Sequence, residues 1–217
     1  TGSQGKTVMK RALQALLARR WQVRANPLSY NTGVGLPLAV LGVELQTRRP
    51  LRLAGGLVRA LWSALGDCRS VDVMVLELGV RQAGDMRAHL EIVQPDVVVV
   101  TPLASGYRDD HEALEVLRDE IATLCHAAAA RGAAVLLCGD DPLLDALAAQ
   151  TPGAVRVALD EVTNDADGTA LHLDGSRWPV RHDTVGASSR CALAVTARVG
   201  RLLGMTDAEI AAFLAAE

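Results

Sequence analysis

Three short apolar runs stand out along the chain, at 71–79, 96–101 and 133–138, and each is bounded by residues typical of turns. Runs of this length that are rich in valine and leucine are typical of strands buried on both faces of a sheet. Between them, apolar residues recur at helical spacing over 83–93 and 110–131. This alternation of strands and helices predicts an α/β fold, with a mostly parallel sheet and helices on both of its faces.

The regions on either side of this alternation predict further elements. Apolar spacing predicts helices at 6–20 and 35–45 and a weaker one at 50–66, and alternation predicts a short strand at 21–25. The C-terminal part differs. Short alternating segments lie at 154–159, 169–173 and 176–181, and two predicted helices follow at 185–204 and 206–216. With a hairpin turn at 165–168, these segments predict a small antiparallel addition near the C-terminal end.

Composition narrows the classes of protein that fit this fold. Of the 217 residues, 50% are hydrophobic and 22% are charged, so the chain can bury a core as one domain over 1–217. A net charge of −3 and an aromatic content of 3% argue against nucleic acid as a partner. Apolar runs stay shorter than the roughly 18 residues of a membrane span, so no membrane span is expected.

The four cysteines are Cys68, Cys125, Cys138 and Cys191, and their spacing matches neither a zinc site nor a C-x-x-C pair. We interpret them as small, buried apolar side chains. A reducing compartment is the simplest setting for such residues, so we expect the protein to be cytoplasmic.

The strongest chemical signal is the opening segment 1–7, which ends in Gly-Lys-Thr and leads into the predicted helix at 6–20. Phosphate-binding loops end in this way. Glycines let main-chain N–H groups turn toward phosphate oxygens, and the N-terminus of the helix adds a positive partial charge. The candidate nucleotide-binding residues are therefore Gly2, Ser3, Gln4, Gly5, Lys6 and Thr7.

Within this loop, Lys6 would reach the outer phosphates of a nucleotide, and the Thr7 hydroxyl would bind Mg²⁺. The alternative is a glycine-rich turn that contains Gly-Lys-Thr by chance. A true loop of this class also needs a strand before Thr1, and that strand should lie at the centre of the sheet.

Glu77 stands at the end of the most apolar of the predicted strands. In open α/β folds, ligands bind at the edge where the parallel strands end. A carboxylate at this edge is a candidate Mg²⁺ ligand beside Thr7, and with Lys6 a candidate catalytic residue. The alternative is a strand-terminal glutamate that faces solvent.

Together with these features, the order of motifs along nearly the whole chain resembles the central ATP-binding domain of the Mur ligase family. The motifs are the loop at 1–7, the segment at 29–38 with its Gly-x-Pro-Leu, the strand and helix start at 75–86, Gln94–Val97, Gly139–Pro142, and Pro179–Asp183 before an alanine-rich helix. Within that family the chain is most similar to the enzymes that add a dipeptide. The resemblance implies a P-loop NTPase-like fold.

The resemblance also implies an activity, that of an ATP-dependent ligase forming a carbon–nitrogen bond in cell-wall precursor synthesis. ATP would phosphorylate a substrate carboxylate, and an amine would attack the acyl phosphate to give an amide. The implied cofactors are ATP and Mg²⁺. The implied partners are ATP, a UDP-sugar peptide, and an amino acid or dipeptide. Asp140, Arg181 and His182 are implied to lie near the nucleotide.

Members of this family carry an N-terminal domain that holds the UDP-sugar and a C-terminal domain that brings the amine. Neither domain corresponds to any part of 1–217, and the strand before the loop is also missing. The two substrates other than ATP are therefore expected to bind through domains outside these residues.

Two departures from the family pattern affect a second metal site. Tyr107 stands where the family has a histidine, with His111 as the alternative ligand, and Arg118 stands where the family has a carbamylated lysine. Arginine keeps its charge and cannot be carbamylated in the same way. These departures motivate an alternative function, a degenerate nucleotide-binding or partner-binding module without ligase activity. An unrelated P-loop kinase or NTPase is a third hypothesis.

Overall fold

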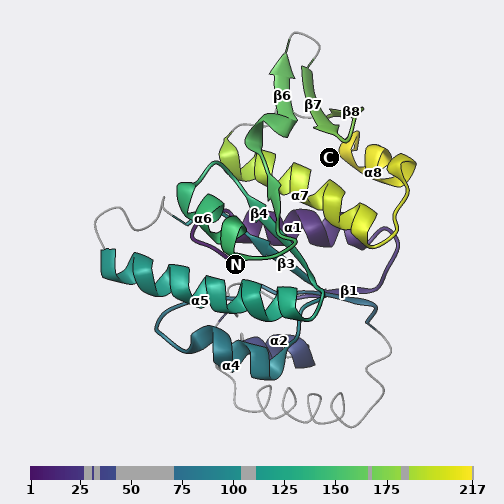
Figure 1. The fold of residues 1–217 in the computed structure, drawn as a ribbon. Helices are drawn as coiled ribbons and strands as arrows, with labels where there is room; N and C mark the ends of the chain where they lie inside the picture. The colour runs from purple at the N-terminus through teal and green to yellow at the C-terminus, as the bar shows by residue number, and fades with distance from the viewer. Residues whose placement is uncertain are drawn as a thin grey trace.

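The computed structural model describes residues 1–26, 31, 35–42, 71–103, 111–165, 168–181 and 186–216. The helix predicted at 50–66 lies outside these residues. The elements follow one another (Figure 1) as α1 (Lys6–Leu17), β1 (Val23–Ala25), α2 (Gly35–Leu41), β2 (Val73–Val75), α4 (Asp85–Ile92), β3 (Val97–Val100), α5 (His111–Ala130), β4 (Ala134–Cys138), α6 (Pro142–Gln150), β5 (Val155–Val157), a 3₁₀ helix (Leu159–Glu161), β6 (Val162–Asp165), β7 (Gly168–Leu173), β8 (Ser176–Val180), α7 (Ala187–Leu202) and α8 (Asp207–Leu214).

Two sets of parallel strands form the centre of the molecule. β1 pairs with β2, and Val23 lies opposite Val73. β4 lies between β3 and β5 and is parallel to both, with Val100 opposite Leu137. The structure thereby confirms the predicted α/β fold, and it brings the carboxyl ends of these strands to a common edge.

The segment predicted at 154–159 belongs to these parallel strands, which corrects its grouping with the antiparallel C-terminal segments. It forms β5 beside β4. Val155 is exposed whereas Val157 is fully buried. An edge strand alternates in this way because only part of it is covered, so its sequence pattern matches that of an antiparallel strand.

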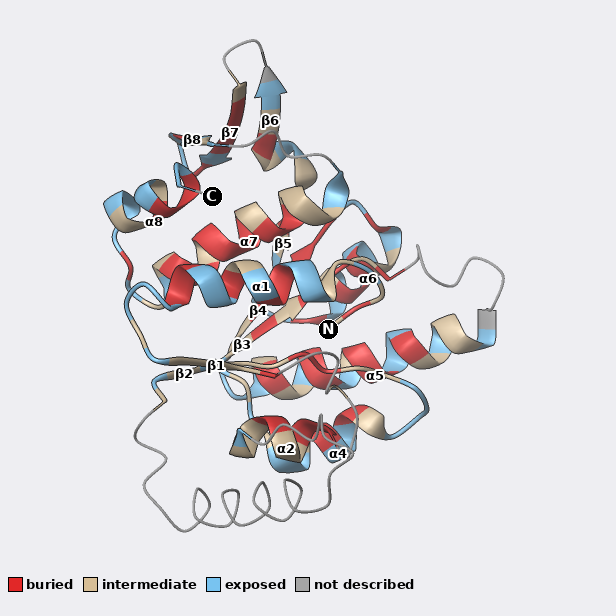
Figure 2. Ribbon diagram, turned by 180° about the vertical axis from the view of Figure 1, so that it is seen from behind, coloured by how far each residue is buried: buried red, intermediate tan, exposed pale blue. Residues whose placement is uncertain are grey.

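Alternate side chains of β4 enter two different hydrophobic cores, one on each face. Leu136 and Cys138 pack with α1, α7, α8 and the antiparallel strands. Val135 and Leu137 pack with α2, α4, α5 and α6. Figure 2 shows α1 and α7 on one side of the parallel strands and α4 and α5 on the other, with their buried positions turned inward. Helices therefore cover both faces, as predicted.

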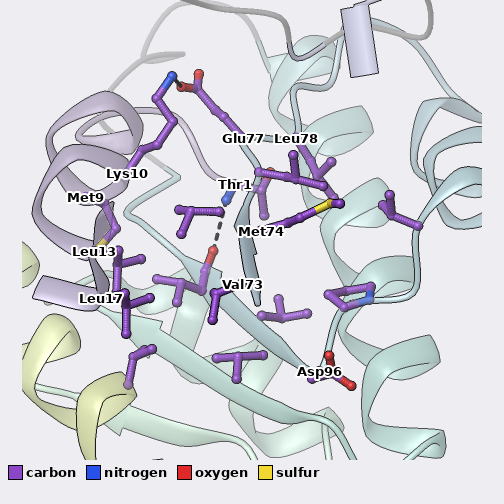
Figure 3. A pocket seen from close by; sticks show the side chains of 18 of the residues that line it. Thr1, Met9, Lys10, Leu13, Leu17, Val73, Met74, Glu77, Leu78 and Asp96 are labelled. Carbon is purple, nitrogen blue, oxygen red and sulfur yellow. Dashed lines mark hydrogen bonds and ion pairs between the residues drawn. The ribbon is translucent and has the colours of Figure 1, made fainter. Parts of the chain in front are cut away.

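Between β2 and β3 lies a slot of about 610 Å³, which is lined by both strands and by α1 (Figure 3). Thr1 lies in this slot, where its nitrogen donates to the carbonyl of Val99 at 2.9 Å. The N–H of Thr101 donates to the carbonyl of Thr1, also at 2.9 Å. These two bonds have the pattern of a parallel pair, so the chain enters the loop at Thr1 in register with β3.

The small antiparallel addition is confirmed. β7 pairs with β6 and β8, and Asp165 lies opposite Gly168 at the predicted hairpin. The guanidinium of Arg201 in α7 lies over the ring of Trp178 in β8, with 4.8 Å between Arg201 Cζ and the centre of the ring. This cation–π contact joins the antiparallel sheet to α7.

Two of the cysteines depart from the expectation of unpaired thiols. Cys138, at the end of β4, and Cys191, in α7, form a disulfide with 5.8 Å between their Cα atoms. Cys125 is free and buried, as expected, and burial raises the pKa of its thiol to about 12. Cys68 lies outside the described residues. The pairing gave no sequence signal because the partners are 53 residues apart.

Membrane crossing finds no support in the described part of the chain, where every helix is too short or too polar to span a bilayer.

We expect reduction of the Cys138–Cys191 disulfide to lower the free energy of unfolding by about 4 kcal/mol, because the bond closes a loop of 53 residues in the unfolded chain. Urea unfolding with and without dithiothreitol measures this difference. The variant Cys138→Ser/Cys191→Ser should not respond to the reductant. Finding both thiols free in protein purified under oxidising conditions would contradict the prediction.

Candidate functional site

The loop at 1–7 is fixed against the end of β3 by its main chain. Ser3 donates its N–H to the carbonyl of Pro102 at 3.0 Å. Gly2 has a φ of 123° and lies so close to Thr101 that a methyl group there would overlap the threonine hydroxyl and carbonyl. The sequence needs glycine at this point because only a residue without a side chain allows this approach.

Gly5 turns the loop into α1. Its φ of 80° is a left-handed conformation that favours glycine. No side chain caps the start of α1, and its first turn contains no acidic residue. The first N–H groups of this helix therefore offer positive partial charge to an anion at the loop.

Lys6 folds back over the loop, where its ammonium group donates to the carbonyls of Gly2 at 2.9 Å and Ser3 at 2.8 Å. Burial lowers the pKa of this ammonium, and the nearby Glu77 carboxylate opposes the shift. The lysine thus holds a partly desolvated positive charge at the centre of the loop, where a phosphate can replace the two carbonyls as its partner.

The loop and Glu77 meet in one cavity. Its volume is about 340 Å³, and it is lined by Ser3, Gly5, Lys6, Thr7, Val8, Asn31 and Glu77. The structure therefore brings together the lysine, the threonine and the carboxylate that the sequence analysis singled out separately. Glu77 follows β2 and is only 5% exposed, which corrects the alternative of a glutamate facing solvent.

Two asparagines hold Glu77 in place. The N–H of Glu77 donates to Asn26 Oδ1 at 2.9 Å, and Asn26 Nδ2 donates back to the Glu77 carbonyl at 3.3 Å. Asn31 Nδ2 donates to Glu77 Oε1 at 3.0 Å. Both asparagines lie in the segment that follows β1, so the carboxylate is oriented by a neighbouring strand and its loop. Asn26 was missed by the sequence analysis because its contacts are all distant in sequence.

Lys10 is a further residue that the sequence analysis missed. It is buried, and its Nζ lies 3.5 Å from Glu77 Oε2 and 2.9 Å from the carbonyl of Asn26. A signal was available, since Lys10 follows Lys6 by four residues and therefore lies on the same side of α1.

The oxygens at this site suit Mg²⁺, which prefers hard oxygen ligands and usually takes only one or two from the protein. Thr7 offers a hydroxyl and Glu77 a carboxylate at the same cavity. The buried Oε2 of Glu77 accepts no hydrogen bond from the described residues. Among the described residues, no three histidine, cysteine, aspartate or glutamate side chains gather as potential metal ligands.

The segment after β4 reaches the same edge as the loop. Gly139 lies against the ring of Pro102, and Asp141 accepts the N–H of Leu103 at 2.7 Å. Asp141 also caps α6, so its role here is structural. Asp140 follows Gly139 and is exposed. It stays a candidate for contact with a nucleotide beyond the phosphates.

Arg181, which the family resemblance places near the nucleotide, instead contacts the end of α8. The N–H of Arg181 donates to the carbonyl of Leu214 at 3.1 Å, and its guanidinium donates to that of Ala216 at 3.1 Å. The structure thus joins Arg181 to the end of α8 and does not place it in the cavity. His182 lies outside the described residues.

The residues of the second metal site are only partly described. Tyr107 and the side chain of His111 lie outside the described residues. Arg118 is exposed on α5, and its guanidinium pairs with the adjacent Asp119 at 2.9 Å.

The parallel strands, the glycine loop that opens α1 and the carboxylate after β2 define a P-loop α/β domain, a class built to bind phosphates. A family model described as the Mur ligase middle domain matches residues 1–190. The chain therefore belongs to the Mur ligase family.

Relatives and solved structures agree with this membership. The UDP-N-acetylmuramoyl-tripeptide–D-alanyl-D-alanine ligase of Mycobacterium tuberculosis is 31% identical over 175 residues, which cover 80% of this chain and 29% of that protein. The ligase of the same name from Bacillus subtilis is 25% identical, over 81% of this chain and 34% of that protein. The chain thus spans about a third or less of the length of these relatives.

Among solved structures, MurF from Acinetobacter baumannii aligns with a TM-score of 0.73 at 15% identity, over 99% of this chain and 44% of that one. MurF ligase from Thermotoga maritima in complex with ADP aligns with a TM-score of 0.71 at 20% identity, over 100% of this chain and 47% of that one. At this identity, both show a shared fold.

We expect Gly2→Ala to weaken ADP binding by at least about tenfold, because a methyl group at this position pushes the loop away from Thr101 and misplaces its N–H groups. The matched control is Gly175→Ala, since Gly175 also has a positive φ but has open space around it. Calorimetric titration with ADP measures both variants. Equal ADP affinity in Gly2→Ala and the unchanged protein would contradict the prediction.

Proposed function

We propose that this chain is the ATP-binding middle domain of a ligase that forms an amide bond in cell-wall precursor synthesis. The observation that carries the proposal is the meeting of Lys6, Thr7 and Glu77 in one cavity at the carboxyl edge of the parallel strands. Membership of the Mur ligase family supports this activity in preference to that of an unrelated P-loop kinase or NTPase.

ATP and Mg²⁺ are the ligands that the site fits. The N–H groups of the loop and the Lys6 ammonium would bind the phosphates, and Asp140 lies at the same edge for contacts beyond them. Thr7 and Glu77 would hold Mg²⁺, which neutralises charge on the transferring phosphoryl group. Binding of ADP by the Thermotoga relative supports a nucleotide at the corresponding place.

The proposed reaction has two steps. ATP transfers its γ-phosphoryl group to a substrate carboxylate, which gives an acyl phosphate and ADP. An amine then attacks the acyl carbon, and phosphate leaves as the amide bond forms. Lys6 would stabilise the negative charge that builds up on the phosphoryl oxygens, and Glu77 would fix the metal on the same group.

The remaining parts of the enzyme are proposed to lie outside these 217 residues. The match covers only 29% and 34% of the two relatives, and their names include a UDP-sugar tripeptide and a dipeptide as the joined groups. We propose that separate domains bind these two substrates here too. We also propose that the slot between β2 and β3 holds a strand that runs into Thr1, because Thr1 pairs with β3 as the last residue of such a strand would.

We place the reaction in the cytoplasm, where ATP is available. Disulfides are rare in that reducing compartment. Cys138 and Cys191 are at most 1% exposed, which shields their bond from thiol reductants.

The alternative function is a nucleotide-binding or partner-binding module without ligase activity. The observation that favours it is Arg118, which stands in the position of the family's modified lysine and instead pairs with Asp119 on an exposed face of α5. This substitution removes one contribution to a second metal site and leaves the loop and Glu77 unchanged.

We expect Lys6→Ala to lower the affinity for ATP about 10- to 100-fold, which corresponds to losing about 1.5–3 kcal/mol from hydrogen bonds between charged groups. Titration with ATP, with and without Mg²⁺, measures the loss. Arg11→Ala is the control, because Arg11 is an exposed residue of the same helix. If the unchanged protein bound no ATP under either condition, the proposed function would be wrong for this chain.

The ligase activity itself can be measured with the full-length gene product. With ATP, UDP-N-acetylmuramoyl-tripeptide and D-alanyl-D-alanine, we expect it to form the amide product and ADP in equal amounts. Glu77→Gln should reduce the rate at least about 100-fold. The neutral amide would hold Mg²⁺ less firmly, and this weakens the electrostatic stabilisation of the transferring phosphoryl group. Chromatography of the UDP-sugar product measures the reaction. Tight ATP binding without any amide product would instead support the module without ligase activity.

A further inference from the structure

The charges beside the cavity include a buried pair. The ammonium of Lys10 lies 3.5 Å from Oε2 of Glu77, and the two side chains are 7% and 4% exposed. The same ammonium donates to the carbonyl of Asn26 at 2.9 Å. Figure 3 shows the two side chains meeting end to end, with Lys10 reaching across from α1 and Glu77 from the chain after β2.

Asn26, Asn31 and Lys10 each contact a different part of Glu77. Asn31 donates to Oε1, and Asn26 accepts the main-chain N–H of Glu77 and donates to its main-chain carbonyl. Lys10 is the charged group that faces Oε2, which receives no hydrogen bond from the described residues. A buried carboxylate needs an opposite charge, since burial without one is costly. In this structure, Lys10 supplies that charge.

The composition points to the same pair of residues. The chain has 22 basic residues, of which 20 are arginine and only Lys6 and Lys10 are lysine. Both lysines lie on one side of α1; Lys6 lines the same cavity as Glu77, and Lys10 pairs with its carboxylate.

Lys10 does not line the cavity that Lys6, Thr7 and Glu77 share. It approaches the carboxylate from the side of the slot, which it lines together with Glu77 and Thr1. A cation that enters the cavity therefore approaches the Glu77 carboxylate from one side, and Lys10 contacts the same carboxylate from the other.

We propose that Lys10 is a positioning residue that acts as the resident counter-cation of Glu77, balancing the buried carboxylate until Mg²⁺ arrives in the cavity. This inference rests on the proposed function, because it assigns Glu77 to the metal. Lys10 stabilises the nucleotide-free domain, and it contributes less once the metal carries the positive charge.

This role has a consequence that a packing role lacks. If Lys10 stabilises the metal-free state more than the metal-bound state, linkage requires that its removal strengthens metal binding by the folded protein. Loss of an ordinary packing contact would lower stability and leave the metal affinity unchanged. Loss of a group needed to orient Glu77 in the bound state would weaken metal binding.

The first experiment needs no ligand. Urea unfolding is measured for the unchanged chain, Lys10→Met, Glu77→Gln and the double variant, and we expect the two substitutions to be coupled at least tenfold in the unfolding equilibrium constant. Folding of the double variant where Lys10→Met alone fails to fold would also support the ion pair. Coupling below twofold would overturn the proposal, whether or not the chain binds nucleotide.

The second experiment measures the affinity of the ADP complex for Mn²⁺ by electron paramagnetic resonance, with ADP affinity in EDTA measured alongside. We expect Lys10→Met to bind Mn²⁺ about tenfold more tightly, since one positive charge has left the neighbourhood of the metal. Its ADP affinity in EDTA should change by less than twofold. Lys10→Arg, which keeps the charge, should restore most of the original Mn²⁺ affinity.

Arg11→Met is the matched control, because it removes an exposed charge one residue further along α1. It should change neither the stability coupling nor the Mn²⁺ affinity. Weaker or unchanged Mn²⁺ binding by Lys10→Met would overturn the proposal. Failure of the unchanged chain to bind ADP at all would count against the proposed function, and the unfolding experiment would still decide whether Lys10 balances Glu77.

Discussion

The attachment of the glycine loop to the end of β3 is the constraint on which the rest of the site depends. Thr1 and Ser3 share main-chain hydrogen bonds with Val99, Thr101 and Pro102, and Gly2 lies directly on Thr101. These contacts set where α1 begins. Because a helix is rigid over one turn, they also set where the ammonium groups of its first two lysines lie relative to the neighbouring strand.

The neighbouring strand contributes the opposite charge. Glu77 is buried at the end of β2 and is held by Asn26 and Asn31 from the segment after β1. Burial of a carboxylate is costly without an opposite charge, and Lys10 supplies one here. We propose that the loop forms the anion-binding half of the site and that the segments after β1 and β2 form its cation-binding half.

Much of this arrangement could be predicted from the sequence, because it depends on local patterns. The glycines and Lys6 of the loop lie within five residues of one another, and Glu77 follows an apolar strand, so both could be assigned to the carboxyl edge. Asn26 and the Cys138–Cys191 disulfide could not, because each depends on contacts between segments far apart in the chain. Lys10 was missed although its spacing of four residues from Lys6 places it on the same side of α1. The edge strand β5 was misgrouped because partial burial gives it the alternation of an antiparallel strand.

The residues proposed for the two metal sites differ in how much the fold depends on them. Glu77 is buried and is held by Asn26, Asn31 and Lys10, so a change there disturbs buried structure. Arg118 lies on an exposed face of α5 and satisfies its charge with the adjacent Asp119, so a change there costs the fold little. Folding therefore constrains Glu77, whereas it places little constraint on position 118. A replacement at position 118 can leave the nucleotide loop intact, which is compatible with either of the two proposed functions.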